Sequence, residues 1–167
     1  MDFKKLANQY RDELLDNVLP FWLEHSQDLE FGGYFSCLDR EGKVFDTDKF
    51  IWLQGREVWM FSMLYNKVEK RQEWLDCAVL GGEFLKKYGH NGDYNWYFSL
   101  NRSGRPLVEP YNIFSYTFAT MAFGQLSLAT GSQEYADIAK KTFEIILSKV
   151  DNPKGKWNKL HPDTRNL

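Results

Sequence analysis

The chain has 167 residues, enough for one domain with a buried core. Hydrophobic residues make up 43% of it and charged residues 26%, the composition of a soluble globular protein. The formal net charge of −2 gives no basic excess, so nucleic acid is not an expected partner. No apolar run reaches membrane-spanning length, and the N-terminus lacks the apolar segment of a signal peptide. Cys37 and Cys77 fit no metal or redox spacing, which favours a cytoplasmic protein with reduced thiols.

Periodic apolar residues predict five helices. The first covers residues 3–25, where Phe3, Leu6, Tyr10 and Leu14 recur at steps of three and four. The other helices are predicted over residues 52–68, 72–88, 112–129 and 132–150. The second and the fourth are apolar on most sides, which is typical of inner helices. Gly81-Gly82 weakens the third by about 1 kcal/mol per glycine, so we expect a close neighbour there.

Two hairpins separate these helices and repeat each other. Alternation over residues 34–45, with a turn at 39–42, predicts the first, and the second occupies residues 90–110. Leu38-Asp39-Arg40-Glu41-Gly42-Lys43 matches Leu100-Asn101-Arg102-Ser103-Gly104-Arg105, 62 residues later. Each unit is therefore an outer helix, a hairpin linker and an inner helix. Such units predict part of a closed ring of helical hairpins, with the linkers at one mouth and a third unit that stops before its inner helix.

The stretch Trp52-Leu53-Gln54-Gly55-Arg56 leads from the first hairpin into an aromatic-rich helix. Arg56 stays charged at any relevant pH and offers five donors in a planar fork, which suits an oxygen that develops negative charge. One alternative is that Arg56 only pairs with an acidic neighbour on an exposed helix face. The aromatic residues around it are, in the same way, either a surface that stacks on sugar rings or plain core.

Other enzyme signals are weak. The sequence has no glycine-rich phosphate loop, no Gly-x-Ser-x-Gly elbow and no His-Glu-x-x-His zinc motif. Asp93-x-Asn95 begins like a calcium loop, but Phe98 stands where glycine is needed. The carboxylates around the first hairpin turn are Asp39, Glu41, Asp46 and Asp48. They are either a pair for glycosidic cleavage or a solvated acidic edge, and the edge is the better interpretation.

Several segments match a known family. They are Gly32-Gly33-Tyr34-Phe35-Ser36-Cys37-Leu38-Asp39-Arg40-Glu41-Gly42-Lys43-Val44, Trp52-Leu53-Gln54-Gly55-Arg56-Glu57-Val58-Trp59-Met60, Gly81-Gly82-Glu83-Phe84-Leu85, Gly104-Arg105-Pro106 and Ile113-Phe114-Ser115. Over nearly the whole chain they resemble the N-acylglucosamine 2-epimerase family, known in animals as renin-binding protein. The Trp-Leu-Gln-Gly-Arg signature is more similar to the N-acylglucosamine branch than to the cellobiose-epimerase or mannose-isomerase branches.

The resemblance implies an all-α (α/α)6 barrel, or toroid. Residues 1–167 would be the N-terminal part of this single domain, with about five helices and β-hairpin linkers. It also implies metal-free interconversion of N-acetylglucosamine and N-acetylmannosamine by proton abstraction and return at carbon 2, without a cofactor. Arg56 matches the family's arginine that stabilises charge on the carbonyl oxygen. Trp52, Tyr111, Phe114 and Ser115 would bind the sugar.

The acid and base of this chemistry need pKa values near neutrality, which suits histidines. The family's acid–base histidines lie in the later half of its longer chain. This sequence has His25, His90 and His161, and none lies in a matching motif, so no catalytic role is transferred to them. Tyr116 stands where we expect many family members to carry an acidic residue. Nucleotides modulate some relatives, so a nucleotide as allosteric activator is an expectation from the resemblance alone.

Three hypotheses follow. The chain is the N-terminal part of a sugar 2-epimerase, a truncated form that binds sugar or protein without catalysis, or a structural fragment without activity. The binding alternative draws on the association of animal relatives with renin. The expected partner is a small amino sugar, with a homodimer as one possible assembly and no membrane contact. An incomplete ring would leave apolar faces of the second and fourth helices uncovered, which favours self-association.

Overall fold

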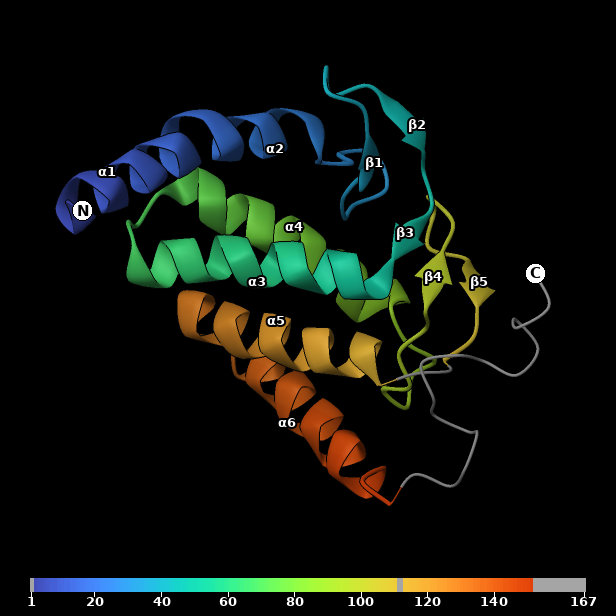
Figure 1. Cartoon of the computed structure of the whole chain (residues 1–167). Helices are drawn as coiled ribbons and strands as arrows, with labels where there is room; N and C mark the ends of the chain where they lie inside the picture. The colour runs from blue at the N-terminus through green and yellow to red at the C-terminus, as the bar shows by residue number, and fades with distance from the viewer. Residues whose placement is uncertain (1, 111–112, 152–167) are drawn as a thin grey trace.

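The structure is a computed structural model that describes residues 2–110 and 113–151, and it is mostly helical (Figure 1). The helical segments are α1 (Phe3–Glu13), η1 (Leu14–Val18), α2 (Leu19–His25), α3 (Ile51–Lys67), α4 (Gln72–Tyr88), α5 (Phe114–Thr130) and α6 (Gln133–Ser148). The first three join end to end, so all five helices expected from the periodicity are confirmed, with ends shifted by at most two residues.

The N-terminal helix changes geometry in its middle, because a proline lies within it. Pro20 stands in the first turn of α2, where it has no N–H to donate to the carbonyl four residues earlier, that of Asp16. The preceding segment η1 is wound as a wider π-helix, a common way for a helix to absorb such a local defect. At the other end, the carboxylate of Asp2 caps α1 by accepting from the backbone N–H groups of Lys4 and Lys5, each at 3.1 Å.

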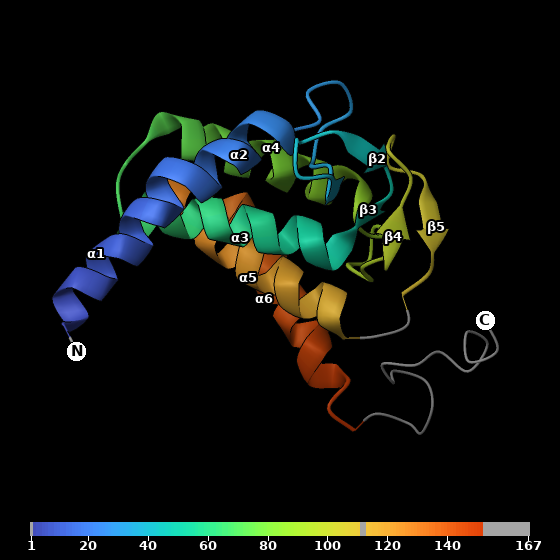
Figure 2. The same cartoon turned by 45° about the horizontal axis from the view of Figure 1, so that its top comes forward.

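Short strands lie at one end of the helices, beside the starts of α3 and α5 (Figures 1 and 2). They are β1 (Cys37–Leu38), β2 (Val44–Asp46), β3 (Lys49–Phe50), β4 (Ser99–Leu100) and β5 (Pro106–Val108). The antiparallel pairs β1–β2 and β4–β5 are the two expected hairpins. The pattern did not show that β3 pairs with β4, with Lys49 opposite Leu100. This pairing joins the two units and sets the start of α3.

The core lies where α3, α4 and α5 meet. The two inner helices, α3 and α5, run side by side from the strand end of the molecule, with α4 against α3 and α6 against α5 (Figure 1). The largest fully buried apolar side chains include Trp74, Trp96, Tyr34, Tyr116, Phe61 and Phe123. Asn66 on α3 donates to the carbonyl oxygen of Gln125 on α5 at 3.0 Å, so the inner pair is also joined by a polar contact.

The close neighbours expected at Gly81-Gly82 are present. A β-carbon at Gly81 would overlap the ring and hydroxyl of Tyr34, and one at Gly82 would overlap the side chain of Leu126 on α5. The Tyr34 hydroxyl also donates to the Cys77 carbonyl oxygen at 2.7 Å. The glycines therefore admit a buried tyrosine and the neighbouring inner helix, which offsets their weak helix propensity.

The two units repeat in detail as well as in outline. Gly42 has φ of 82° and lies against the His25 ring, while Gly104 has φ of 91° and lies against the Tyr88 ring. Asp39 accepts from the Lys43 N–H in the first turn, as Asn101 accepts from the Arg105 N–H in the second, each at 2.8 Å. The 62-residue repeat inferred from the sequence is thus a structural repeat.

Apolar side chains remain exposed on α5. Phe114, Met121 and Leu128 recur every seven residues and are 46%, 37% and 69% exposed. The large apolar side chains of α3 are instead buried or only partly exposed. Of the two helices expected to leave an apolar face uncovered, α5 does so clearly and α3 much less. Within the described residues, no helix combines the length and the apolar character needed to cross a membrane.

Candidate functional site

Arg56 lies in the second turn of α3, and its side chain is exposed. Its guanidinium carbon is 5.7 Å from the ring centre of Trp52 and 5.6 Å from that of Phe118 on α5. Among the described residues, no carboxylate forms an ion pair with Arg56. The described residues thus supply no acidic surface partner for Arg56. The aromatic faces hold the guanidinium in place without neutralising it, so its donors can serve a further group.

The other residues of the signature explain how Arg56 is held. The side-chain amide of Gln54 accepts from the Tyr34 N–H and donates to the Tyr34 carbonyl oxygen, both at 2.8 Å. Gly55 lies against α5, where a β-carbon would come within 3.0 Å of the backbone of Phe118. Gln54 thus ties α3 to the loop before β1. Gly55, which has no side chain, allows α5 to pack closely against α3. Together these contacts bring Phe118 up to Arg56.

The predicted sugar-binding residues lie in different environments. Trp52 is partly buried, and its ring centre is 6.2 Å from that of Phe118. Phe114 is 46% exposed at the start of α5, whereas Ser115 beside it is buried. Tyr111 lies outside the described residues. α3 and α5 begin at the same end of the molecule, so Trp52 and Phe114 both lie at the strand end (Figure 2).

Phe118 is a candidate site residue because its ring contacts Arg56, whereas the sequence analysis counted it only as part of an apolar helix. It lies 62 residues after Arg56, and Phe114 lies 62 residues after Trp52. The repeat offset, applied to the helices as well as to the hairpins, would have identified Phe118 as the counterpart of Arg56 on the next unit. Because neighbouring units pack side by side, such counterparts are expected to lie close together.

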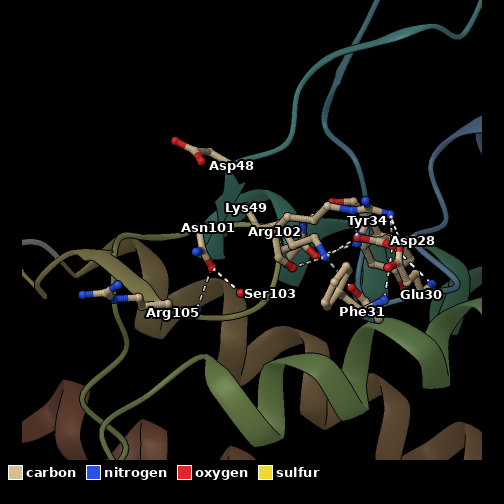
Figure 3. Close-up of polar contacts among 12 residues, drawn as sticks. Asp28, Glu30, Phe31, Tyr34, Asp48, Lys49, Asn101, Arg102, Ser103 and Arg105 are labelled. Carbon is tan, nitrogen blue, oxygen red and sulfur yellow. Dashed lines mark hydrogen bonds and ion pairs between the residues drawn. The ribbon is translucent and has the colours of Figure 1, made fainter.

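A buried lysine fixes the start of α3. Lys49, two residues before the first residue of α3, is fully buried and donates to three oxygens (Figure 3). These are Asp28 Oδ2 at 2.8 Å, the Gly32 carbonyl at 2.6 Å and the Arg102 carbonyl at 2.9 Å. All three N–H groups of the ammonium are therefore used. Burial lowers the pKa of Lys49, and its bonds to Asp28 oppose that effect.

Arg102 approaches the same carboxylate from the second hairpin (Figure 3). It donates from Nε and Nη2 to the two oxygens of Asp28 at 3.0 and 3.1 Å, and its guanidinium carbon is 4.9 Å from the Phe31 ring centre. Burial alone would raise the pKa of Asp28, but the hydrogen bonds from Arg102 and Lys49 outweigh it and hold that pKa below its usual value. This cluster joins the two linkers beside the start of the Arg56 helix.

The two described histidines serve local structure. The ring of His25 lies 4.9 Å from that of Phe21 and beneath Gly42. His90 stacks on Tyr94 at 4.8 Å, accepts from the Gly92 N–H at Nδ1, and has its pKa lowered by burial. His161 lies outside the described residues.

Tyr116 is a core residue, and burial raises its pKa to about 12. Its hydroxyl donates to Asn95 Oδ1 at 3.2 Å. Tyr116 therefore ties α5 to the loop that precedes β4, as Gln54 ties α3 to the loop that precedes β1.

The carboxylates of the first hairpin support its turns. Asp39 accepts from the Glu41 and Lys43 N–H groups at 3.0 and 2.8 Å, and Asp46 accepts from the Asp48 N–H at 2.8 Å. This arrangement matches the acidic edge rather than a catalytic pair. In the part of the chain that the structure describes, no group of three or more His, Cys, Asp or Glu side chains is placed to hold a metal ion.

Comparison with known proteins gives a consistent family match. Residues 33–166 match the model of the N-acylglucosamine 2-epimerase (GlcNAc 2-epimerase) family. The chain is 44% identical over 149 residues to N-acylglucosamine 2-epimerase of Mus musculus, covering 86% of this chain and 36% of that protein. It is 28% identical over 167 residues to cellobiose 2-epimerase of Dictyoglomus turgidum, and this match covers 95% of this chain and 42% of that protein. These identities agree with the branch that the Trp-Leu-Gln-Gly-Arg signature indicated.

The fold comparison agrees. The solved structure of cellobiose 2-epimerase from Bacillus thermoamylovorans B4167 superposes with a TM-score of 0.78 and 28% identity, over 87% of this chain and 37% of that one. The five helices therefore correspond to part of an (α/α)6 barrel. The chain spans about a third of the length of the relatives it matches.

Proposed function

Because this chain belongs to the N-acylglucosamine 2-epimerase family, we propose that it forms the arginine-bearing part of an isomerase that interconverts N-acetylglucosamine and N-acetylmannosamine. The observation that carries the proposal is the exposed Arg56, held between Trp52 and Phe118 with no described carboxylate to neutralise it. The whole protein would be a single (α/α)6 domain with residues 1–167 as its N-terminal part. A cytoplasmic setting belongs to the same proposal, supported by the free thiols of Cys37 and Cys77.

In the proposed reaction, a base removes the proton on carbon 2 of the ring-opened sugar, and an acid returns one to the opposite face. The intermediate carries negative charge on the oxygen of carbon 1. Arg56 would hold that oxygen by charge-assisted hydrogen bonds, which strengthen as the charge develops. Trp52 and Phe114 would stack on the apolar face of the sugar. The acid and base would come from a segment corresponding to the later part of the relatives.

Proton exchange at carbon 2 tests the proposal. The 167-residue chain is incubated with N-acetylmannosamine in deuterated water, and the carbon-2 proton signal is followed by NMR. We expect no loss above a buffer blank for this chain and clear loss for a longer chain that includes the histidines. Arg56→Ala in the longer chain should reduce the rate by about 10²-fold or more, the usual effect of removing an oxyanion donor. Exchange that survives Arg56→Ala unchanged would overturn the role of Arg56.

A second candidate is sugar binding without catalysis, which the exposed Phe114 and the partly exposed Trp52 favour. Saturation-transfer NMR with N-acetylmannosamine reports such contact directly. Transfer to the sugar ring protons that is lost in Trp52→Ala would support a binding surface on this chain alone. Absence of transfer would leave the stacking role of Trp52 without support and restrict sugar contact to the longer protein.

A further inference from the structure

A short hydrogen-bonded chain connects the end of α2 to α3. The Ser26 hydroxyl oxygen lies 2.6 Å from the Trp22 carbonyl oxygen and 2.5 Å from Glu57 Oε1. Ser26 caps the C-terminus of α2, and Glu57 follows Arg56 directly on α3. Both contacts are within hydrogen-bond range for a pair of oxygens, so each requires a proton between its two atoms.

The number of protons decides the state of Glu57. A serine hydroxyl carries one proton, and a carbonyl oxygen carries none. If Ser26 donates to Glu57, its contact with the Trp22 carbonyl at 2.6 Å has no proton and is repulsive. If Ser26 donates to Trp22, the contact with Glu57 needs a proton from the carboxyl group. A protonated Glu57 gives each contact its own proton, whereas an ionised Glu57 leaves the single Ser26 proton to be shared between two acceptors.

The surroundings of Glu57 favour the same state. Burial raises the pKa of its carboxyl group to about 8, and this outweighs the opposite effect of a hydrogen bond donated by Ser26 to the carboxylate. None of the described lysine, arginine or histidine side chains forms an ion pair with it. The titratable groups that interact with its charge are Tyr34, before β1, and Cys77, on α4.

Neither neighbour offers a positive charge to a Glu57 carboxylate. Burial raises the pKa of Tyr34 and of Cys77, and a charged Glu57 raises both further. His25, beside Ser26 in the sequence, lies 3.9 Å from the exposed Glu24 carboxylate and packs on Phe21. A carboxylate at Glu57 would thus be a charge without a partner at a helix contact, which is costly.

We propose that Glu57 is a positioning residue for Arg56, held as the neutral acid, which donates to Ser26 and so fixes the rotation of α3 against the end of α2. Loss of its proton places a charge at this contact and weakens the packing of α3 against the end of α2, close to Arg56. The protonation state of Glu57 is argued from its contacts and its burial, whereas its relevance to catalysis rests on the function proposed above.

An NMR titration of the 167-residue chain, with ¹³C-labelled glutamate side chains, tests the protonation state. Glu57→Gln identifies the Glu57 signal by its loss, and sequential backbone assignment identifies it if that variant does not fold. We expect the Glu57 carboxyl carbon to titrate near pH 8. The internal comparison is Glu83, whose burial is outweighed by hydrogen bonds from Tyr135 and Lys86, so that its pKa is lowered. A Glu57 midpoint as low as that of Glu83 would overturn the proposal.

The positioning role has its own measurement, the ¹⁵Nε signal of Arg56 over the same pH range. We expect this signal to shift with the Glu57 midpoint in the unmodified chain and to lose that step in Glu57→Gln. The glutamine amide can still donate to Ser26 but cannot ionise. An Arg56 signal that does not follow Glu57, or that keeps the step in the variant, would refute the positioning role. Neither titration needs sugar turnover, so failure of the proposed function would appear separately, in the carbon-2 exchange experiment.

Stability gives a third measurement with a defined sign. A carboxyl whose pKa is raised in the folded state stabilises the fold most below its ordinary pKa, and this stability is lost as the pH rises towards 8. The melting temperature of the unmodified chain should therefore fall more between about pH 5 and about pH 8 than that of Glu57→Gln. Parallel curves for the two proteins would contradict a neutral Glu57. Ser26→Ala should lower the melting temperature at the acidic end, where the intact chain of hydrogen bonds is present.

Discussion

Gly55 on α3 lies directly against the backbone of Phe118 on α5. A β-carbon at Gly55 would be 3.0 Å from both the carbonyl carbon and the carbonyl oxygen of Phe118. Backbone atoms of a packed helix cannot move aside as a side-chain end can. We therefore expect Gly55→Ala to destabilise the fold by about 1–3 kcal/mol, as for other overpacked core positions, and to disturb the Phe118 ring that holds Arg56. Chemical denaturation measures the loss.

The matched control is Gly124→Ala on α5. A β-carbon there would meet nothing within 4 Å, and the residue has helical backbone geometry. Alanine should therefore stabilise by up to about 1 kcal/mol, because of its higher helix propensity. Equal losses in both variants would show that crowding against Phe118 is not the cause.

Gln54→Ala tests the link between α3 and the loop before β1. Removal of the amide leaves the N–H and the carbonyl oxygen of the buried Tyr34 without their partner. We expect a loss of about 2–3 kcal/mol, with faster hydrogen exchange of the Tyr34 amide than in the unmodified chain. Gln72→Ala is the control, since that exposed side chain donates to the exposed Asp76, and its effect should stay within about 0.5 kcal/mol. Unchanged exchange at Tyr34 would contradict the link.

Lys49→Met tests the buried ammonium at the start of α3. The methionine fills similar space but leaves the carbonyl oxygens of Gly32 and Arg102 unpaired. We expect a loss of about 3 kcal/mol, at the lower end for breaking a buried pair because Arg102 still binds Asp28. Lys43→Met, at an exposed position of the first hairpin, should change stability by no more than about 0.5 kcal/mol. Similar effects of the two substitutions would refute the special role of Lys49.

Asp28 makes the same cluster sensitive to acid. Its pKa is below the ordinary 3.8 in the folded state, so the stability it contributes is present above that pH and is lost as the pH falls through the folded value. The difference in unfolding free energy between the unmodified chain and Asp28→Asn should therefore shrink from about pH 6 to about pH 3. Urea unfolding at both values measures it. A constant difference would mean that the Asp28 charge does not contribute.

The exposed row on α5 predicts association of the chain at high concentration. Phe114, Met121 and Leu128 form an apolar stripe of the kind that drives contact between molecules. Leu128→Glu should lower the weight-average mass measured by light scattering. Lys140→Gln changes the net charge by the same amount at an exposed site on α6 and should leave the mass unchanged. A monodisperse monomer that melts cooperatively before any substitution would contradict this prediction.

The helices followed from the sequence because their apolar residues keep a regular period over four or more turns. The hairpins followed because turn residues such as Asp39 and Gly42 recur at Asn101 and Gly104. Two-residue strands leave no such pattern, so the pairing of Lys49 with Leu100 was not predictable. It depends on contacts between segments about 50 residues apart, which local periodicity does not record.

The candidate site was predictable from the sequence only in part, because it too depends on contacts between distant segments. Arg56 was recognised from its motif, but its aromatic neighbour on α5 depends on how the helices pack. Glu57 illustrates the limit more sharply. A glutamate beside an arginine in a sequence resembles an ordinary surface charge, and only the fold reveals that its carboxyl group meets the end of α2.

The repeat also has an evolutionary meaning. Phe118 stands in the second unit where Arg56 stands in the first, and the two side chains touch. If the units descend from one duplicated hairpin, the duplication supplied more than a scaffold. The position is charged in one copy and aromatic in the next, and the aromatic ring is the surface on which the charge rests. A ring built from like parts thus acquires chemical asymmetry by divergence between adjacent copies, without a new segment of chain.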